Sequence, residues 1–476
     1  MTRPTDSSEL SPLPPEFAVA DDGGGLFSRP YAAASATFLA TMFLTGFAAL
    51  AVVPTLPTAA EALDGVALFP LVAGCFVAAG MFGGVLGGHW ADVSGARRPL
   101  AAGMVLTVLT LVVAASSTSI WQLAAGRFLE GLAAGMVAVS VNTAIGEAYP
   151  ERLRPRALAL MSAGWIVPSL AGPPLAGVVA ETWSWRAVFY GLAALTLVPS
   201  LAMIVVLRRR AWSDDRPRET TARPALLVTL AVSVGAALGQ YGVSGWNVRH
   251  AVLAGAGAVL LVALAPRLLP EGTWRSASGL PATVLLRGLS SGVFFTLEAF
   301  VPLMLITERK VDAVVIGLVF TSAAVVWAAG SWVQGRWLDG WPRHRLVCVG
   351  AGVQTAAVAV ALAGTLPGVP ALVGAAAMPL AAVGMGMMAP ALTVLSLVHS
   401  GPGRQGQASG AMQTSQNLGQ IAVLGLATAV LNVSQAFGAP QLASYGAAFG
   451  ALLAPGVLPL VLGRRTRRRS EVLEVG

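Results

Sequence analysis

Ionisable side chains stand deep inside two of the long apolar runs of this sequence. Arg127 and Glu130 lie three residues apart in GRFLEGLAAG, and Glu298 lies in FFTLEAFVPLML. An ionised group in an apolar surround is costly, so it usually marks a transport pathway or a paired charge. We expect Glu298 or Glu130 to take up and release a coupling proton, with Arg127 acting on the site. A static Arg–Glu pair that ties helices together is the alternative.

Other apolar runs carry side chains suited to contact with a ligand. Glutamines at helical spacing either line a path or bond neighbouring helices. Phenylalanines and methionines suit a deformable apolar pocket, although packing against lipid would use the same residue types. The candidate cavity residues are Phe43, Phe47, Met385, Met388, Gln413, Gln416 and Gln420.

Motifs for other chemistry are missing from the sequence. Lys310 is the only lysine, so no Gly-Lys-(Ser/Thr) phosphate loop exists. The four histidines are scattered along the sequence, which has neither a His-Glu-x-x-His motif nor a pair of cysteines at the spacing of metal ligands. We therefore expect no cofactor, no metal site and no enzyme activity, and an ion gradient as the energy source.

Composition places the chain in lipid. Hydrophobic residues make up 55% of the sequence, charged residues 11%, and the mean hydropathy is +0.72. Too little polar surface remains to coat a soluble globule of 476 residues. Cys75 and Cys348 both lie in or against apolar runs, which favours inert packing over a disulfide.

Apolar runs of about 20 residues, the length that crosses roughly 30 Å of hydrocarbon, predict an all-α polytopic membrane protein. About fourteen helices are expected. They lie at 30–55, 66–88, 99–117, 121–147, 157–180, 187–207, 224–245, 249–266, 281–306, 312–337, 346–365, 370–397, 406–432 and 441–463.

The net charge of +8 comes from clusters of arginine in alternate loops between these runs. Cytoplasmic loops collect Arg and Lys, so the pattern predicts cytoplasmic N- and C-termini. The basic excess is then a topology signal, and no nucleic-acid partner is needed.

An internal repeat divides the chain into two halves. GHWADVSGARR begins at Gly88 and GRWLDGWPRHR begins at Gly335, and both fit Gly-x-x-x-Asp-x-x-(Gly/Pro)-x-x-Arg. Parallel repeats of this kind place a substrate site between the halves near the midplane. The predicted divisions are a disordered tail 1–29, a six-helix bundle 30–207, a basic linker 208–223, two inserted helices 224–266, a linker 267–280, a second six-helix bundle 281–463 and a basic tail 464–476.

The first of these loops resembles the signature of the major facilitator superfamily, in which it lies between helices two and three. Gly88, Asp92, Gly95, Arg97 and Arg98 match, whereas Val93 replaces the usual base. The resemblance implies a cytoplasmic gate in which Asp92 caps a helix of the other half near Gln407. Glu147 is a candidate partner for Arg97. The repeat extends the gate to Asp339, Arg343 and Arg345, and a tight turn with basic topology anchors is the alternative.

Two further matches concern the fourth and fifth expected helices. Arg127, Gly131 and Gly135 resemble the family's fourth-helix motif. In the fifth helix, the residues that resemble the antiporter motif of drug exporters are Gly164, Gly172, Pro173 and Gly177. Small residues there also serve ordinary helix packing.

The resemblance implies a secondary active transporter that exports small apolar or amphipathic molecules in exchange for protons by alternating access. Uptake or lipid transport by the same fold is one alternative, and a membrane sensor or scaffold without transport is another. We expect a multi-pass protein of the plasma membrane whose partners are the lipid bilayer, a small-molecule substrate and protons, and which works as a monomer.

Overall fold

The structure, a computed structural model, describes residues 25–29, 31–150, 153, 156–157, 160–161, 164, 166–209, 223–338, 340–400 and 405–467. All regular elements in this part of the chain are helices, as expected. Twelve of them are long and apolar enough to cross a membrane. Two of the expected spans correspond to shorter stretches, Ile166–Thr182 and Leu226–Gly242, so the count of fourteen stays a prediction.

The first group of helices packs around a glycine-lined contact. A Cβ at Gly83 would overlap the carbonyl of Leu132, and one at Gly135 would overlap that of Gly80. Small residues in both helices let the two backbones meet without side chains between them. The group consists of α1 (Ala32–Val52), α2 (Leu56–Ala62), α3 (Phe69–Ser94), α4 (Arg97–Ala115), α5 (Ile120–Ala148), α7 (Ile166–Thr182) and α8 (Trp185–Arg209). We call it the N-terminal half.

The second group packs in the same manner. Gly288 and Gly419 approach each other so closely that a Cβ at Gly419 would overlap the Gly288 backbone. The group consists of α11 (Leu280–Thr307), α12 (Ala313–Arg336), α13 (Arg343–Ala363), α14 (Ala371–His399), α15 (Gln405–Ala436), α16 (Gln441–Ala451) and α17 (Leu453–Leu462). We call it the C-terminal half.

The two inserted helices, α9 (Arg223–Gly242) and α10 (Val248–Leu264), pack on each other. Helix α9 also contacts α3 of the N-terminal half and α15 of the C-terminal half. Ser233 Oγ donates to the Ala78 carbonyl at 2.7 Å, and Gln240 Nε2 donates to the Ile421 carbonyl at 2.8 Å. The insert therefore bridges the two halves. The predicted tail 1–29 and linker 208–223 fall largely outside the described residues.

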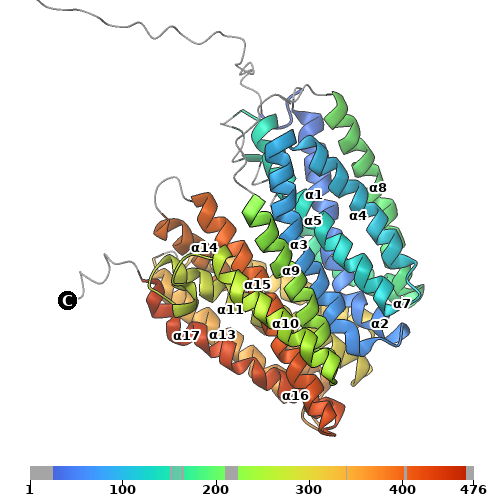
Figure 1. The fold of residues 1–476 in the computed structure, drawn as a ribbon, viewed down its shortest axis with the longest axis vertical. Helices are drawn as coiled ribbons and strands as arrows, with labels where there is room; N and C mark the ends of the chain where they lie inside the picture. Colours follow the sequence, from blue (N-terminus) through green and yellow to red (C-terminus); the bar gives the residue numbers. More distant parts are fainter. Residues whose placement is uncertain are drawn as a thin grey trace, which may run out of the picture.

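The two halves converge at one end and diverge at the other (Figure 1). We call the end with the arginine-rich loops the basic end. One hydrophobic core joins both halves at the opposite end, where residues such as Val52 and Leu123 share it with Phe300 and Leu305. At the basic end, Phe38, Leu100 and other residues of the N-terminal half form a separate core. Among the residues that the structure describes, the core shared by both halves thus lies at the end away from the basic loops, and α3 and α15 also contact each other.

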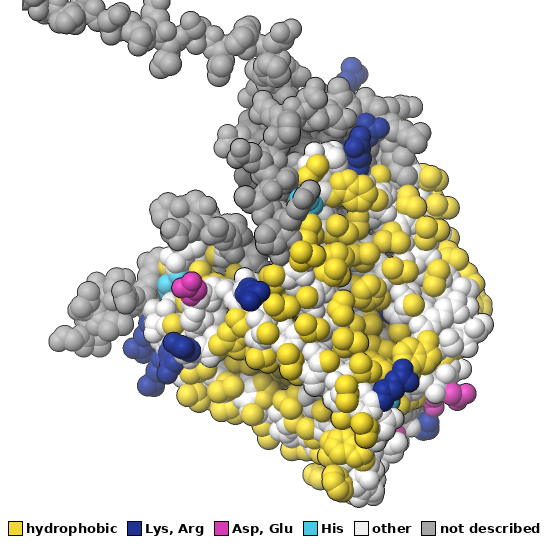
Figure 2. Space-filling view, in the orientation of Figure 1, with side chains coloured by type: hydrophobic (Ala, Val, Ile, Leu, Met, Phe, Trp, Pro, Cys, Tyr) yellow, Lys and Arg dark blue, Asp and Glu magenta, His cyan; other side chains and the backbone are white. Residues whose placement is uncertain are grey.

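The outer surface fits a membrane environment. Figure 2 shows hydrophobic side chains over most of the described surface of one face, with few charged side chains among them. Val248, Val252 and Val259 on α10 are among the exposed apolar residues. Such a surface is unstable in water and stable against lipid chains.

Candidate transport site

Arg127 and Glu130 form an ion pair in the half of α5 away from the basic end. Arg127 Nη1 donates to Glu130 Oε2 at 2.8 Å, and both side chains are only 3% exposed. The Arg127 guanidinium also lies 4.3 Å from the centre of the Phe76 ring on α3. The pair is thus enclosed between α3 and α5, which favours the static pair in this conformation. Its part in proton coupling stays a prediction.

Glu298 lies at a similar depth in α11, in the half of the helix that ends at Thr307. Its side chain is half-buried. Within the described part of the chain it forms no ion pair and no hydrogen bond, and Arg127 pairs with Glu130 instead. The structure therefore does not join Arg127, Glu130 and Glu298 in one cluster. It leaves Glu298 as a carboxylate without a fixed partner.

The polar stripe of α15 divides into residues with different surroundings. Gln416 Oε1 accepts from Arg287 of α11, at 2.6 Å from Nη2 and 3.1 Å from Nε. Gln413 is exposed and donates to Asn417 at 3.2 Å, whereas Gln420 is buried. Gln416 thus bonds neighbouring helices, and Gln413 is the exposed member of the stripe.

The residues of the predicted apolar pocket have different degrees of burial. Phe43 and Phe47 are half-buried on α1, with ring centres 6.0 Å apart. Met385 and Met388 are fully buried in the C-terminal half, where Met388 Sδ accepts from Ser290 at 3.5 Å. Methionine fills gaps in this core because its side chain is unbranched and flexible. Ligand contact by either methionine would require repacking, and it stays a prediction.

The helix-five motif lies at the contact between the two halves. A Cβ at Gly177 would lie 2.7 Å from the Ala313 carbonyl of α12, and one at Gly317 would lie 2.8 Å from the Pro173 carbonyl. Thr321 of α12 donates to the Leu170 carbonyl at 3.1 Å. The motif therefore permits backbone contact between α7 and α12 away from the basic end.

The other two motif glycines face the N-terminal half. A Cβ at Gly172 would lie 3.7 Å from Ala51 of α1. Gly164 precedes α7, in a turn rather than in the helix, and a Cβ there would lie 3.1 Å from Leu39. The motif thus serves packing against α1 as well as against α12.

The first predicted gate loop forms a tight turn between α3 and α4. A Cβ at Gly88 would lie 3.3 Å from Val139 of α5. Gly95 ends α3 with φ 74° and ψ 161°, a backbone region that is essentially restricted to glycine. Arg97 and Arg98 begin α4. The side chains of Asp92 and Glu147 are not among those that the structure describes, so their roles in the gate stay predictions.

The second predicted gate loop is only partly described. Arg343 begins α13, and Arg345 two residues later is exposed. Asp339, like the Gln407 side chain, lies outside the described residues. The charge contacts expected of the gate therefore stay predictions in both repeats.

Sequence reasoning missed Gln240 as a bridge between the halves. Its side chain is buried, and its hydrogen bond to Ile421 reaches across to α15. The sequence could have pointed to this contact, because Gln240 is the single glutamine in the apolar run 224–245 and a buried polar group in lipid needs a partner.

Known proteins share both sequence and architecture with this chain. The family model of the Major Facilitator Superfamily matches residues 38–424. A probable multidrug-efflux transporter of Mycobacterium tuberculosis is 25% identical over 382 residues, which cover 76% of this chain and 80% of the relative. The cis,cis-muconate transport protein of Acinetobacter baylyi is 30% identical over 148 residues, 30% of this chain and 35% of the relative.

A solved structure extends the likeness to the fold. A POT family transporter in complex with 5-aminolevulinic acid superposes with a TM-score of 0.69 at 12% identity, covering 91% of this chain and 97% of the other. At that identity the likeness concerns the fold alone. Because the family match spans most of the chain, this all-helical multi-pass membrane protein belongs to the Major Facilitator Superfamily.

Proposed function

We propose that this transporter exports small apolar or amphipathic molecules in exchange for protons by alternating access. It acts as a monomer in the plasma membrane, with both termini in the cytoplasm. The efflux relative from Mycobacterium tuberculosis supports export, and the motif contact of Gly177 and Pro173 with α12 is consistent with it. In this orientation the described conformation is closed toward the outside.

The position of the Glu298 carboxylate, without a fixed partner among the described residues, is the observation that carries the proposal. A half-buried carboxylate inside a spanning helix, with no fixed partner among the described residues, is free to exchange a proton as its surroundings change. A purely structural carboxylate would be paired, as Glu130 is with Arg127. Glu298 is therefore the coupling carboxylate in our proposal, with the Arg127–Glu130 pair as a second, more enclosed candidate.

The test measures efflux of a fluorescent cationic dye from cells stripped of their own exporters. We compare the wild type, Asp92→Asn and Glu298→Gln with and without a protonophore. Glu271→Gln is the matched control because Glu271 is an exposed carboxylate in a loop. We expect dye efflux in the wild type and the control only while the gradient is intact, and failure of efflux in both other variants.

A second assay separates coupling from folding. Purified protein in liposomes, with dye on both sides and no proton gradient, reports substrate exchange alone. Glutamine imitates a protonated glutamate, so Glu298→Gln should retain exchange and lose only uphill transport driven by a gradient. Gradient-driven transport at the normal rate in this variant would remove Glu298 from the mechanism.

The same measurements distinguish the alternatives. Dye accumulation driven by the gradient, instead of efflux, would favour uptake by the same fold. Equal dye retention in cells with the wild type and with each variant would reject export of a broad range of dyes. A narrower substrate or a lipid would then be tested. A complete lack of exchange with any substrate would favour a sensor or scaffold.

A further inference from the structure

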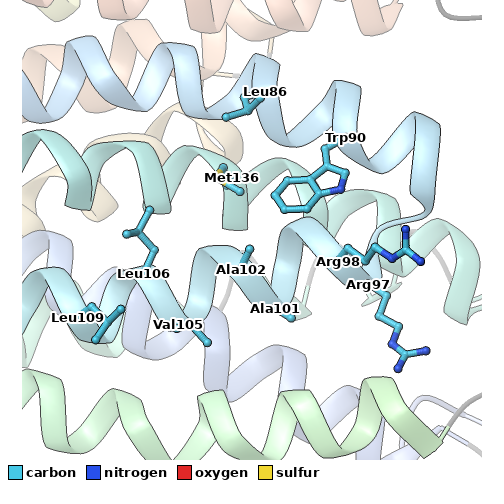
Figure 3. A pocket seen from close by; sticks show the side chains of 10 residues that line it. All are labelled: Leu86, Trp90, Arg97, Arg98, Ala101, Ala102, Val105, Leu106, Leu109 and Met136. Carbon is cyan, nitrogen blue, oxygen red and sulfur yellow. The ribbon is translucent and has the colours of Figure 1, made fainter.

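A groove of about 690 Å³ lies on the outer side of the N-terminal half, between α3, α4 and α5. Trp90, Arg97 and Arg98 lie at one end, and Leu109 lies at the other (Figure 3). All lining residues belong to the N-terminal half, so this groove is separate from the contact between the two halves.

The groove opens toward the membrane, and its walls are apolar. Val105 is 45% exposed and Leu109 is 57% exposed, although both lie on a spanning helix. Met136 of α5 and Leu86 of α3 also line the groove (Figure 3). Such a surface is suited to a hydrocarbon chain and unsuited to water.

The length of the groove matches one leaflet of a bilayer. At 1.5 Å per residue, the stretch of α4 from Arg97 to Leu109 rises roughly 18 Å. One leaflet contributes about half of the roughly 30 Å hydrocarbon core. A groove that begins at the headgroup level therefore reaches close to the midplane, as one extended acyl chain does.

The charged end is complementary to a phosphate group. Both guanidinium groups lie at the groove end that Trp90 also lines (Figure 3). Neither Arg97 nor Arg98 has an ion-pair partner among the residues that the structure describes. Tryptophan is typical of the headgroup level of a membrane, and the planar guanidinium donors bind phosphate oxygens well.

We propose that this groove binds one anionic phospholipid. The phosphate lies on Arg97 and Arg98 beside Trp90, and one acyl chain follows α4 toward Leu109. Basic pockets between spanning helices on the cytoplasmic side are suited to anionic headgroups. A bound lipid would link the α3–α4 turn, with its Gly95, to the membrane at the end where the two halves diverge.

The test titrates the purified full-length protein in detergent with phosphatidylglycerol and counts bound lipids by native mass spectrometry. Phosphatidylcholine with the same acyl chains tests the headgroup, and dihexanoyl phosphatidylglycerol tests the chain. The first variant is Arg97→Gln/Arg98→Gln. The second is Ala102→Phe, which fills the middle of the groove.

The matched control is Arg267→Gln/Arg275→Gln, which removes the same charge from exposed positions between α10 and α11. We expect tight binding of one long-chain phosphatidylglycerol. The Arg97→Gln/Arg98→Gln variant should weaken it roughly 10-fold or more, while the control binds as the wild type does. Ala102→Phe should also weaken binding of the long-chain lipid, though both arginines remain.

Three results would overturn the proposal. Equal affinity for phosphatidylglycerol and phosphatidylcholine would show that Arg97 and Arg98 do not select an anionic headgroup. Equal weakening in the control pair would mean a general effect of surface charge. Unchanged binding in Ala102→Phe, or equal affinity for the short-chain lipid, would show that no acyl chain occupies the groove.

Discussion

Arg127 and Glu130 illustrate how burial decides what an intramembrane charge does. Each side chain is 3% exposed, and Phe76 covers the guanidinium. Removing one member of a buried pair leaves an uncompensated charge, which costs about 3–5 kcal/mol. Replacing both members by apolar residues of similar size is far less costly, because no charge remains to be buried.

A double-mutant cycle follows from this pair. We expect Arg127→Met and Glu130→Met each to lower the melting temperature of the purified protein markedly, and the double variant to recover most of the loss. Thermal unfolding in detergent checks this, with gradient-driven transport measured on the same samples. A double variant as unstable as the worse single variant would contradict the coupling between the two charges.

Gly95 is constrained by its backbone conformation. With φ 74° and ψ 161°, it lies in a region that costs other residues about 1–3 kcal/mol. Gly95→Ala should therefore lower the melting temperature and weaken transport. Gly340→Ala is the matched control, because Gly340 lies in the corresponding turn with open space around it. Equal stability of the two variants would contradict the strain at Gly95.

At the scale of elements, helix contacts in this protein depend on small residues. Lipid is as apolar as leucine, so helices gain little from burying large side chains against each other. They gain from close packing, as α3 and α5 show where Gly83 meets Leu132. The contact between α7 and α12 uses the same principle across the two halves.

A bulky residue at Gly177 should force α7 and α12 apart. Its Cβ would lie 2.7 Å from a backbone carbonyl, so Gly177→Val overpacks the contact at a cost of about 1–3 kcal/mol. We expect a lower melting temperature and loss of most transport. Gly191→Val on α8 is the control, since nothing lies within 4 Å of that position. Transport equal to the control would mean that the contact is dispensable.

At the scale of the whole molecule, the two halves meet away from the basic end. Their shared core and the exposed ion pair between Lys310 and Glu61, at 3.1 Å, both lie there. An exposed pair of this kind contributes only about 0–1 kcal/mol, so it does not by itself hold the halves together. It nevertheless marks two positions on opposite halves that are near each other.

Cross-linking these positions tests alternating access. In a background with Cys75→Ala and Cys348→Ala, Glu61→Cys and Lys310→Cys are joined by a cleavable bifunctional thiol reagent. We expect transport to stop, because the halves can no longer separate at this end, and to return after reductive cleavage. Each single-cysteine variant treated alike is the control. Full transport in the cross-linked protein would contradict separation of the halves at this end.

Much of the architecture could be predicted because it depends on local properties. An apolar run specifies a spanning helix by its length, and GHWADVSGARR with GRWLDGWPRHR revealed the internal repeat. The candidate site was less predictable. Glu298, Arg127 and Glu130 were identified by charge within apolar runs, but nothing in their spacing showed that only two of them would pair.

The sequence by itself determined that the chain is helical, lies in a membrane and contains two related halves, since composition and hydrophobic length need no knowledge of neighbours. The tertiary structure alone decided that α9 bridges the halves through Ser233 and Gln240, and that Met385 and Met388 are enclosed. It also decided that the described parts of the two halves share a core away from the basic end. These outcomes depend on contacts between helices that are distant in sequence. Such contacts arise from the shapes of two packed surfaces, and a single apolar run does not specify the surface that it meets.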